Sequence, residues 1–235
     1  MPVNAVNAEN TFSHRYSALA TAFALAVLFA WDASGLDLAL ARLMSGAAGF
    51  PARDHLLLTT VLHEGARMLS GLMLLGLLLS VWRPWGVLAR LSRSQRLWLL
   101  GTVASSMLLV SVAKRWSVTS CPWDLAGFGG QLPYVPHWLL GRTDGGPGHC
   151  FPAGHASAGF AWLAGWFAWP RGSRIGRRWL WAALSAGLVL GLAQQLRGAH
   201  FMSHTLWMAW LCWTWAWLLS ALLPDSRVHH APAAG

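Results

Sequence analysis

Apolar residues gather along the chain in six long runs that are separated by polar segments. The runs cover about residues 16–31, 56–82, 97–113, 151–169, 179–196 and 205–223. An α-helix needs roughly 20 apolar residues to cross the hydrocarbon core of a bilayer, and the shorter runs can borrow flanking residues to reach that length. The pattern therefore predicts an all-α, polytopic membrane protein with six transmembrane helices. A short amphipathic helix is also expected at about residues 36–44.

The polar segments between the runs differ in charge. Residues 83–96 and 171–178 each carry four arginines and no acidic residue. Because cytoplasmic loops of membrane proteins carry an excess of arginine and lysine, both segments should lie in the cytoplasm, together with both chain termini. The long connection 116–150, the start of the fourth run and residues 197–204 then share the opposite, non-cytoplasmic face.

Composition supports a membrane protein and narrows its partners. The chain has 235 residues, of which 55% are hydrophobic and only 11% are charged, and it contains 17 tryptophans, which favour membrane interfaces. A net charge of +9 is compatible with nucleic-acid binding, but here it comes almost wholly from arginines in the loops. We expect a single membrane domain over residues 1–235, in contact with the bilayer and with no nucleic-acid partner.

Three polar groups stand out on the predicted non-cytoplasmic face. Lys114, the only lysine of the chain, ends the third apolar run, and His155 follows Pro-Ala-Gly where a polar loop enters the fourth run. Arg197, His200 and His204 are spaced by three and four, so on a helix they share one face. Backbone amides at a helix start favour anions, and ionisable groups near a membrane are costly without partners. These places should converge on one phosphate.

The ordered set resembles the three motifs of the type-2 phosphatidic acid phosphatase superfamily, usually written K-x6-R-P, P-S-G-H and S-R-x5-H-x3-D. The matching residues are Lys114 with Cys121-Pro122, Pro152-Ala153-Gly154-His155, and Gly198-Ala199-His200 with Ser203-His204. The resemblance covers about residues 97–223, which we take as the catalytic core. It implies a phosphatidic-acid-phosphatase-like bundle of six helices and an integral membrane lipid phosphatase that needs no metal or other cofactor.

Four positions depart from the family pattern. Cys121 replaces the arginine of the first motif and Ala153 the serine of the second. If His200 is the nucleophile, Gln194 replaces the arginine and His204 the aspartate of the third motif. Arg197, one turn closer, can then supply a guanidinium. In the alternative register His204 is the nucleophile and Met208 takes the place of the acid; we prefer His200.

The resemblance implies a role for each matched residue. His200 attacks phosphorus to form a phosphohistidine, while His155 protonates the leaving oxygen and later activates water. His204 orients His200 in place of the acid. The transferring phosphoryl group is held by Lys114, Arg197 and the backbone amide of Gly154.

The cysteines raise a separate hypothesis. Cys121 and Cys150 both lie in the predicted non-cytoplasmic loops, beside the first two motifs. In a bacterial inner-membrane protein that side faces the periplasm, where a disulfide can form and replace the lost arginine contact. The alternative is two unpaired thiols packed as small hydrophobic groups.

A polar group on the second run, His63, Glu64 and Arg67, has two interpretations. We favour an ion pair that docks this helix, and the alternative is a contribution to headgroup specificity. No paired Cys/His spacing typical of zinc ligands is present.

The sequence thus predicts an enzyme of the bacterial inner membrane whose active site faces the periplasm. It would hydrolyse a lipid phosphate monoester or diphosphate. A lipid phosphotransferase with the same intermediate is an alternative. A second alternative is a catalytically degenerate membrane transporter or binding protein.

Overall fold

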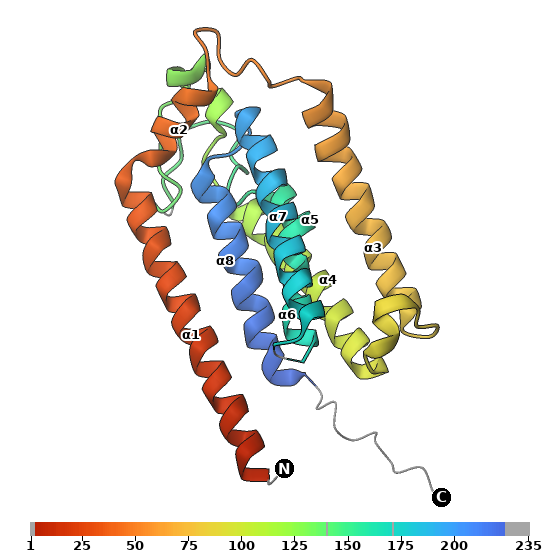
Figure 1. Cartoon of the computed structure of the whole chain (residues 1–235). Coiled ribbons are helices and arrows are strands. Elements are labelled where there is room, and N and C mark those ends of the chain that lie inside the picture. The colour runs from red at the N-terminus through yellow and green to blue at the C-terminus, as the bar shows by residue number, and fades with distance from the viewer. Residues whose placement is uncertain (1–2, 140, 171, 224–235) are drawn as a thin grey trace, which may run out of the picture.

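A computed structural model describes residues 3–139, 141–170 and 172–223, with side chains from residue 15 onward, so Arg171 of the arginine-rich segment lies outside the described residues. Within these ranges every regular element is helical (Figure 1). Five stretches are long and apolar enough to cross a membrane. They belong to α1 (Val3–Ser34), the π-helix η1 (Leu57–Gly65) with α3 (Ala66–Ser80), α4 (Arg93–Trp116), α7 (Arg174–Leu196), and α8 (Met202–Leu219) with η7 (Ser220–Leu222).

The predicted fourth crossing takes a different form. Residues 154–168 form a broken helix made of η5 (Gly154–Ala156), α5 (Ser157–Phe160), η6 (Ala161–Leu163) and α6 (Ala164–Ala168). It is shorter than a normal transmembrane helix, so the structure gives five candidate spans where the sequence predicted six. The broken helix is nevertheless almost completely buried, with α4, α7 and α8 packed around it. Because protein rather than lipid surrounds it, its length need not match the bilayer.

Glycine allows the broken helix to lie directly against α7. A Cβ atom on Gly159 would come within 2.3 Å of the backbone nitrogen of Gly187, and one on Gly187 would come within 2.3 Å of the Phe160 ring. The two backbones therefore approach as closely as small residues permit, as is common between membrane helices.

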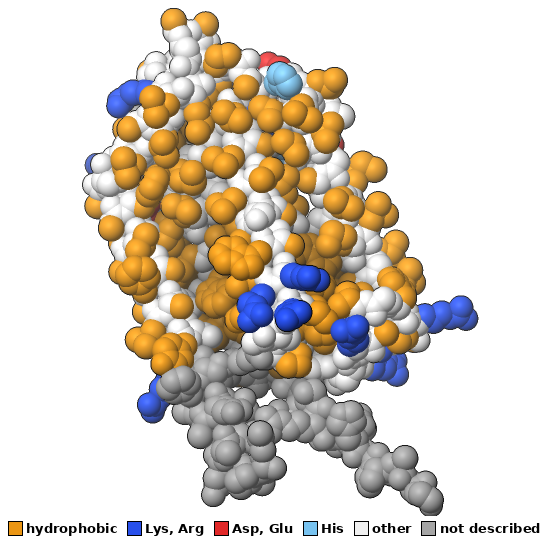
Figure 2. Space-filling view, in the orientation of Figure 1, with side chains coloured by type: hydrophobic (Ala, Val, Ile, Leu, Met, Phe, Trp, Pro, Cys, Tyr) orange, Lys and Arg blue, Asp and Glu red, His pale blue; other side chains and the backbone are white. Residues whose placement is uncertain are grey.

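Two helix starts are fixed by side chains at the end of the molecule that carries the arginine loops. Ser92 and Gln95 form a capping box at the start of α4, and the Ser173 hydroxyl accepts a hydrogen bond from the Gly176 amide at the start of α7. Arginine side chains gather at this lower end in Figure 2, whereas apolar side chains cover most of the surface above.

The opposite end is built from connections. The predicted short helix is confirmed as α2 (Leu36–Met44). Residues 117–139 and 141–153 belong to a long loop, and within these described residues the regular elements are two short helical turns, η3 (Pro122–Asp124) and η4 (Ala126–Phe128). Asp37 of α2 accepts hydrogen bonds from the backbone amide and the hydroxyl of Ser203, so it caps the start of α8 from a distant part of the chain.

Helix α3 stands apart from the rest of the bundle (Figure 1). Only 11% of its apolar window is buried, against 39% for α7. Several of its leucines and methionines are exposed, as expected for a helix that faces lipid. The space between α3 and α7 is an apolar groove, which opens beside the candidate site described next.

Candidate active site

The three predicted polar groups come from different elements at one end of the bundle. Lys114 lies in the last turn of α4, His155 in η5, and His200 in the connection between α7 and α8. The Ala153 amide donates to the His204 carbonyl oxygen (3.2 Å), which ties the loop before His155 to α8. Sequence positions 40 to 90 residues apart are thereby brought to one place.

A Schellman motif at the end of α7 turns the chain toward the site. The amides of Gly198 and Ala199 donate to the carbonyl oxygens of Gln195 and Gln194, both at 2.8 Å. Gly198 has a φ of +73°, and a Cβ there would lie 2.2 Å from the Phe50 ring. Glycine is therefore required directly before the residue pair that carries His200.

A cavity of about 510 Å³ lies at the ends of α4 and η5. Lys114, Gly154 and His155 line it, and the side chain of Lys114 runs along Gly154, since a Cβ on this glycine would be 3.7 Å from the ammonium nitrogen. The structure thus brings these three predicted residues together. A backbone amide, an ammonium group and an imidazole facing one cavity form a suitable site for a phosphate.

Two further residues of this cavity, His63 and Arg67, belong to the polar group on the second run. The His63 ring stacks on the His155 ring with centroids 3.6 Å apart. Glu64 contacts His63 Nδ1 at 2.8 Å, but this pair lies within one helical turn and is partly exposed. The ion pair is present, but it joins neighbours of one helix and not two helices, and His63 and Arg67 line the candidate cavity, which favours the alternative interpretation.

The π-helical turn of η1 explains why the spacing of polar residues in the second apolar run did not place His63 at the candidate site. His63 lies in η1, in which wider turns replace those of an α-helix, and such turns are frequent at functional sites. Each π-helical turn contains more residues than the 3.6 of an α-helical turn. A prediction that assumes 3.6 residues per turn therefore places the side chains of η1 on the wrong face of the helix. The signal available in the sequence was the presence of three ionisable groups within an apolar run.

His200 does not line this cavity; it is buried, with only 4% of its surface exposed, and lines a separate small pocket beside α2. Its pKa is lowered well below the ordinary value, first by burial and then by the positive charges of His204, Lys114 and His155 nearby. The neutral imidazole, which is the nucleophilic form, is therefore favoured. The pKa of His155, which precedes α5, is lowered to about 3 by burial, with smaller contributions from His63, Lys114, Arg197 and Arg67.

Cys150 lies beside the candidate nucleophile. It is bonded to Cys121, and its sulfur is 3.6 Å from His200 Nδ1 and 3.1 Å from the Ala199 carbonyl oxygen. The bond joins the segment after Lys114 to the segment before His155, and backbone hydrogen bonds from His149 to Ser117 and from Cys150 to Thr119 hold the same two segments together.

The same three residues are also the only compact group of metal-ligand types in the described part of the chain. The ligand atoms of Cys121, Cys150 and His200 lie within 4.8 Å of one another. Metal binding by cysteine requires thiolates. In this structure the two sulfurs are bonded to each other, so the group does not fit a metal in this state.

Arg197 is only partly directed at the phosphate cavity. Its Nη1 donates to Gln194 Oε1 at 3.1 Å and its Nε to the Arg53 carbonyl oxygen at 2.9 Å, and its guanidinium lies 5.9 Å from the Trp123 ring. It does not line the 510 Å³ cavity. Its charge nevertheless acts on His155.

His204 is completely enclosed by rings. Its ring makes edge contacts with His200 and His137, with centroids 5.7 and 5.3 Å apart. His137 stacks on Phe151 and its Nε2 lies 3.5 Å from Asp32 Oδ2, an ion-pair distance without hydrogen-bond geometry. A row of three imidazoles therefore leads from the candidate nucleophile to a buried carboxylate on α1.

Sequence reasoning missed Asp32 and His137. Both side chains of this pair are nearly buried, and Trp207 Nε1 donates to Asp32 Oδ2 at 2.9 Å. An acidic residue at the end of the first apolar run and a histidine in a proline-rich loop carry no sequence signal that links them. Asp32 Oδ1 and His204 Nδ1 are buried without a hydrogen-bond partner. Burying such polar atoms lowers the stability of the folded protein, which is a feature of functional sites more often than of ordinary cores.

Comparison with known proteins identifies the chain at the level of its family. The model of the PAP2 superfamily matches residues 95–227, more than half of the chain. Neither a curated protein nor a solved structure matches. The matched region contains Lys114, His155 and His200, and the protein is all-helical with helices suited to a membrane. The chain therefore belongs to the PAP2 superfamily, the type-2 phosphatidic acid phosphatases.

Proposed function

We propose that the protein is an integral membrane phosphatase that hydrolyses a lipid phosphate monoester or diphosphate through a phosphohistidine on His200. Membership of the superfamily supports a phosphatase in general terms. The observation that carries the proposal is the 510 Å³ cavity, in which the charged groups are Arg67 and Lys114 beside the imidazoles of His63 and His155, with no carboxylate among the lining residues. Such a cavity favours a phosphate dianion over a neutral headgroup.

In the first step neutral His200 attacks phosphorus, and the bond from phosphorus to the lipid oxygen breaks. Nδ1 of His200 faces Cys150, so Nε2 is the attacking nitrogen. His155 donates a proton to the leaving oxygen. Its pKa is low in the empty site, but the negative charge of a bound phosphate raises it, so the proton can arrive with the substrate.

In the second step water attacks the phosphorus of the phosphohistidine. His155, now neutral, accepts a proton from this water, the P–N bond breaks, and inorganic phosphate leaves with His200 restored. Lys114 and the Gly154 amide hold the phosphoryl oxygens, and Arg67 joins them from α3. Arg197 acts through its charge and by contact with Gln194. These steps use side chains and one backbone amide of the protein, and we expect them to need no metal or cofactor.

His204, His137 and Asp32 together take the place of the aspartate of the family's third motif. As His200 attacks phosphorus its ring gains positive charge, and the nearest buried carboxylate is Asp32, reached through His204 and His137. In this arrangement the carboxylate stabilises the imidazolium through two rings rather than by direct contact.

The membrane orientation follows from charge. The end with the arginine loops lies in the cytoplasm, and the broken helix from α5 to α6 returns the chain to that side inside the bundle, which completes the sixth crossing. The site then lies at the non-cytoplasmic face, in a bacterial inner membrane the periplasmic face. An oxidising compartment there supports the bond between Cys121 and Cys150.

Phosphate release from a panel of lipid phosphates by the purified protein tests the proposal. We expect wild type to release inorganic phosphate from at least one lipid, and His155→Ala and His200→Ala each to lose at least about 10²-fold in rate, a loss typical of removing an acid–base group or a nucleophile. His55→Ala, at an exposed histidine outside the site, is the matched control and should keep full activity. A phosphorylated acceptor lipid in place of free phosphate would show a phosphotransferase. No phosphate release from any lipid would contradict the proposal.

A further inference from the structure

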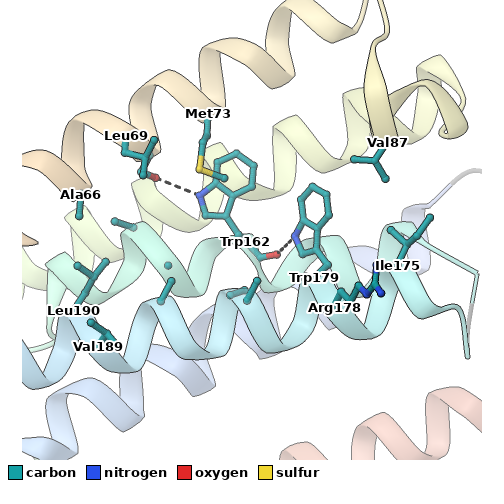
Figure 3. A pocket seen from close by; sticks show the side chains of 16 residues that line it. Ala66, Leu69, Met73, Val87, Trp162, Ile175, Arg178, Trp179, Val189 and Leu190 are labelled. Atoms are coloured by element: carbon teal, nitrogen blue, oxygen red, sulfur yellow. Dashed lines mark hydrogen bonds between the residues drawn. The ribbon is translucent and has the colours of Figure 1, made fainter.

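A long apolar groove separates α3 from α7 and has a volume of about 690 Å³ (Figure 3). Its walls include Leu69 and Met73 on α3 and Val189 and Leu190 on α7, and its far end is closed by Val87, Ile175 and Arg178. We call it the α3–α7 groove. It is larger than the phosphate cavity, and its lining has only one charged residue.

Small residues and satisfied indoles form the floor. The broken helix contributes Ala158 and Gly159, and α7 contributes alanines at 182, 183 and 186. Two tryptophans cross the floor, and their polar atoms are already bonded: Trp162 Nε1 donates to Ser70 Oγ at 3.3 Å and Trp179 Nε1 to the Trp162 carbonyl oxygen at 2.8 Å. The lining of the groove is therefore apolar, with almost no free hydrogen-bonding group for a ligand.

One end of the groove opens at the phosphate cavity. Ser70 and Ala158 line both spaces. From there the groove follows α7 from Leu190 to Ile175, 15 residues or about 22 Å at 1.5 Å per residue. The hydrocarbon core of a bilayer is about 30 Å thick, so the groove is longer than one leaflet.

We propose that the α3–α7 groove binds the hydrocarbon chain of the substrate whose phosphate occupies the cavity of Lys114 and His155; the inference rests on the proposed function. A ligand with an anionic head and a long apolar chain matches the two connected spaces. Because the bilayer is as apolar as the groove, binding the chain removes little apolar surface from water and depends on packing. The groove therefore selects by shape and length, and it favours a chain that extends beyond one leaflet.

Two substitutions on the groove floor test whether the groove binds the substrate chain, because each should limit the chain length that the groove accepts. Ala186→Phe fills the groove close to the site, and Ala182→Phe fills it about one helical turn, or ~6 Å, farther away. Ser185→Phe on the same helix is the control, because Ser185 is exposed and does not line the groove. The substrates are a series of alkyl phosphates, from a chain too short to leave the phosphate cavity to one long enough to reach Val87.

The expected result is a chain-length cut-off that moves with the position of the phenylalanine. Wild type should prefer the long chains. Ala186→Phe should lose about tenfold or more in kcat/KM beyond a short cut-off and Ala182→Phe beyond a longer one, while both keep the wild-type rate on the shortest phosphate. An equal loss of kcat/KM on all chain lengths would overturn the proposal; it is the result expected if the groove holds a resident phospholipid, bound through Arg178. A dependence of kcat/KM on chain length that neither substitution changes would overturn it as well.

A second measurement separates this inference from the proposed function. An alkyl phosphate with a photoreactive group at the chain end is crosslinked to wild-type protein, and the labelled residues are located by mass spectrometry. Labels on Met73, Val87 or Ile175 that inorganic phosphate displaces support the groove, whether or not the protein releases phosphate. Labels confined to the outer faces of the helices would overturn it.

Discussion

At the residue scale, we propose that a row of three imidazoles leading to Asp32 takes the place of the carboxylate that the family's third motif carries. In the family pattern an aspartate follows the nucleophilic histidine by four residues, and here that position is His204. The structure adds His137 in contact with His204, and Asp32 at 3.5 Å from His137. Each of these groups is buried, so the charge of Asp32 is weakly screened and can act over a longer distance than at a surface.

Asp32→Asn tests this row. Removing the charge leaves the shape of the side chain but should lower kcat by about tenfold, equivalent to ~1.4 kcal/mol, with KM little changed, since Asp32 does not touch the phosphate cavity. Asp32→Glu restores the charge and should recover part of kcat. A merely structural role for Asp32 predicts instead that Asn and Glu lower thermal stability with no selective change in kcat.

The environment of His200 also sets the pH dependence of activity. Its pKa is lowered by burial and by nearby positive charge, Lys114 included. As pH falls, an ordinary histidine is protonated near 6.5, whereas His200 remains neutral and nucleophilic to lower pH. The acid limb of kcat/KM should therefore lie below the limb expected for an ordinary histidine.

Lys114→Gln provides the matched comparison for this prediction. Loss of the ammonium charge raises the pKa of His200, so the acid limb should move to higher pH, while titration of the substrate phosphate is the same for both proteins. The measurement is the pH dependence of kcat/KM for wild type and Lys114→Gln with the same lipid phosphate. A limb that stays in place or moves to lower pH would contradict the assigned role of Lys114 and His200.

At the scale of elements, the sequence predicted long helices better than interrupted ones. The apolar runs predicted the five candidate spans and the short helix α2, because periodicity and length determine such helices, although α1 begins at Val3, 13 residues before the predicted run. The broken helix of residues 154–168 was predicted as a regular span. Its glycines and alanines serve close packing against α7, and this depends on a partner that the local sequence does not reveal.

The site shows the same division between local and distant information. Lys114, Gly154 and His155 could be placed in one cavity because ordered motifs on one membrane face required it. His63 and Arg67 needed knowledge of the π-helical turn, and Asp32 and His137 needed tertiary contacts alone. Motif spacing therefore predicted the centre of the site. The sequence also singled out His63 and Arg67 but left their role open, whereas Asp32 and His137 came only from the structure.

At the scale of the whole molecule, charge and hydrophobicity divide the protein along its length. Arginine loops occupy one end (Figure 2), the phosphate cavity lies at the other, and the α3–α7 groove (Figure 3) connects the cavity to the apolar middle. For the lipid phosphate that we propose as substrate, this arrangement leaves a lateral route from the bilayer, because α3 is largely free of the bundle. On that proposal the head would reach the site while the chain stays at membrane depth.

The central claim is that His200 carries the phosphoryl group. Its most direct test is a rapid alkaline quench of the protein during turnover of a lipid phosphate, followed by mass spectrometry of the peptide that contains His200 and His204. We expect phosphohistidine at His200 in wild type and none in His200→Ala. Phosphate on His204, or no phosphohistidine in a protein that is turning over substrate, would contradict the account.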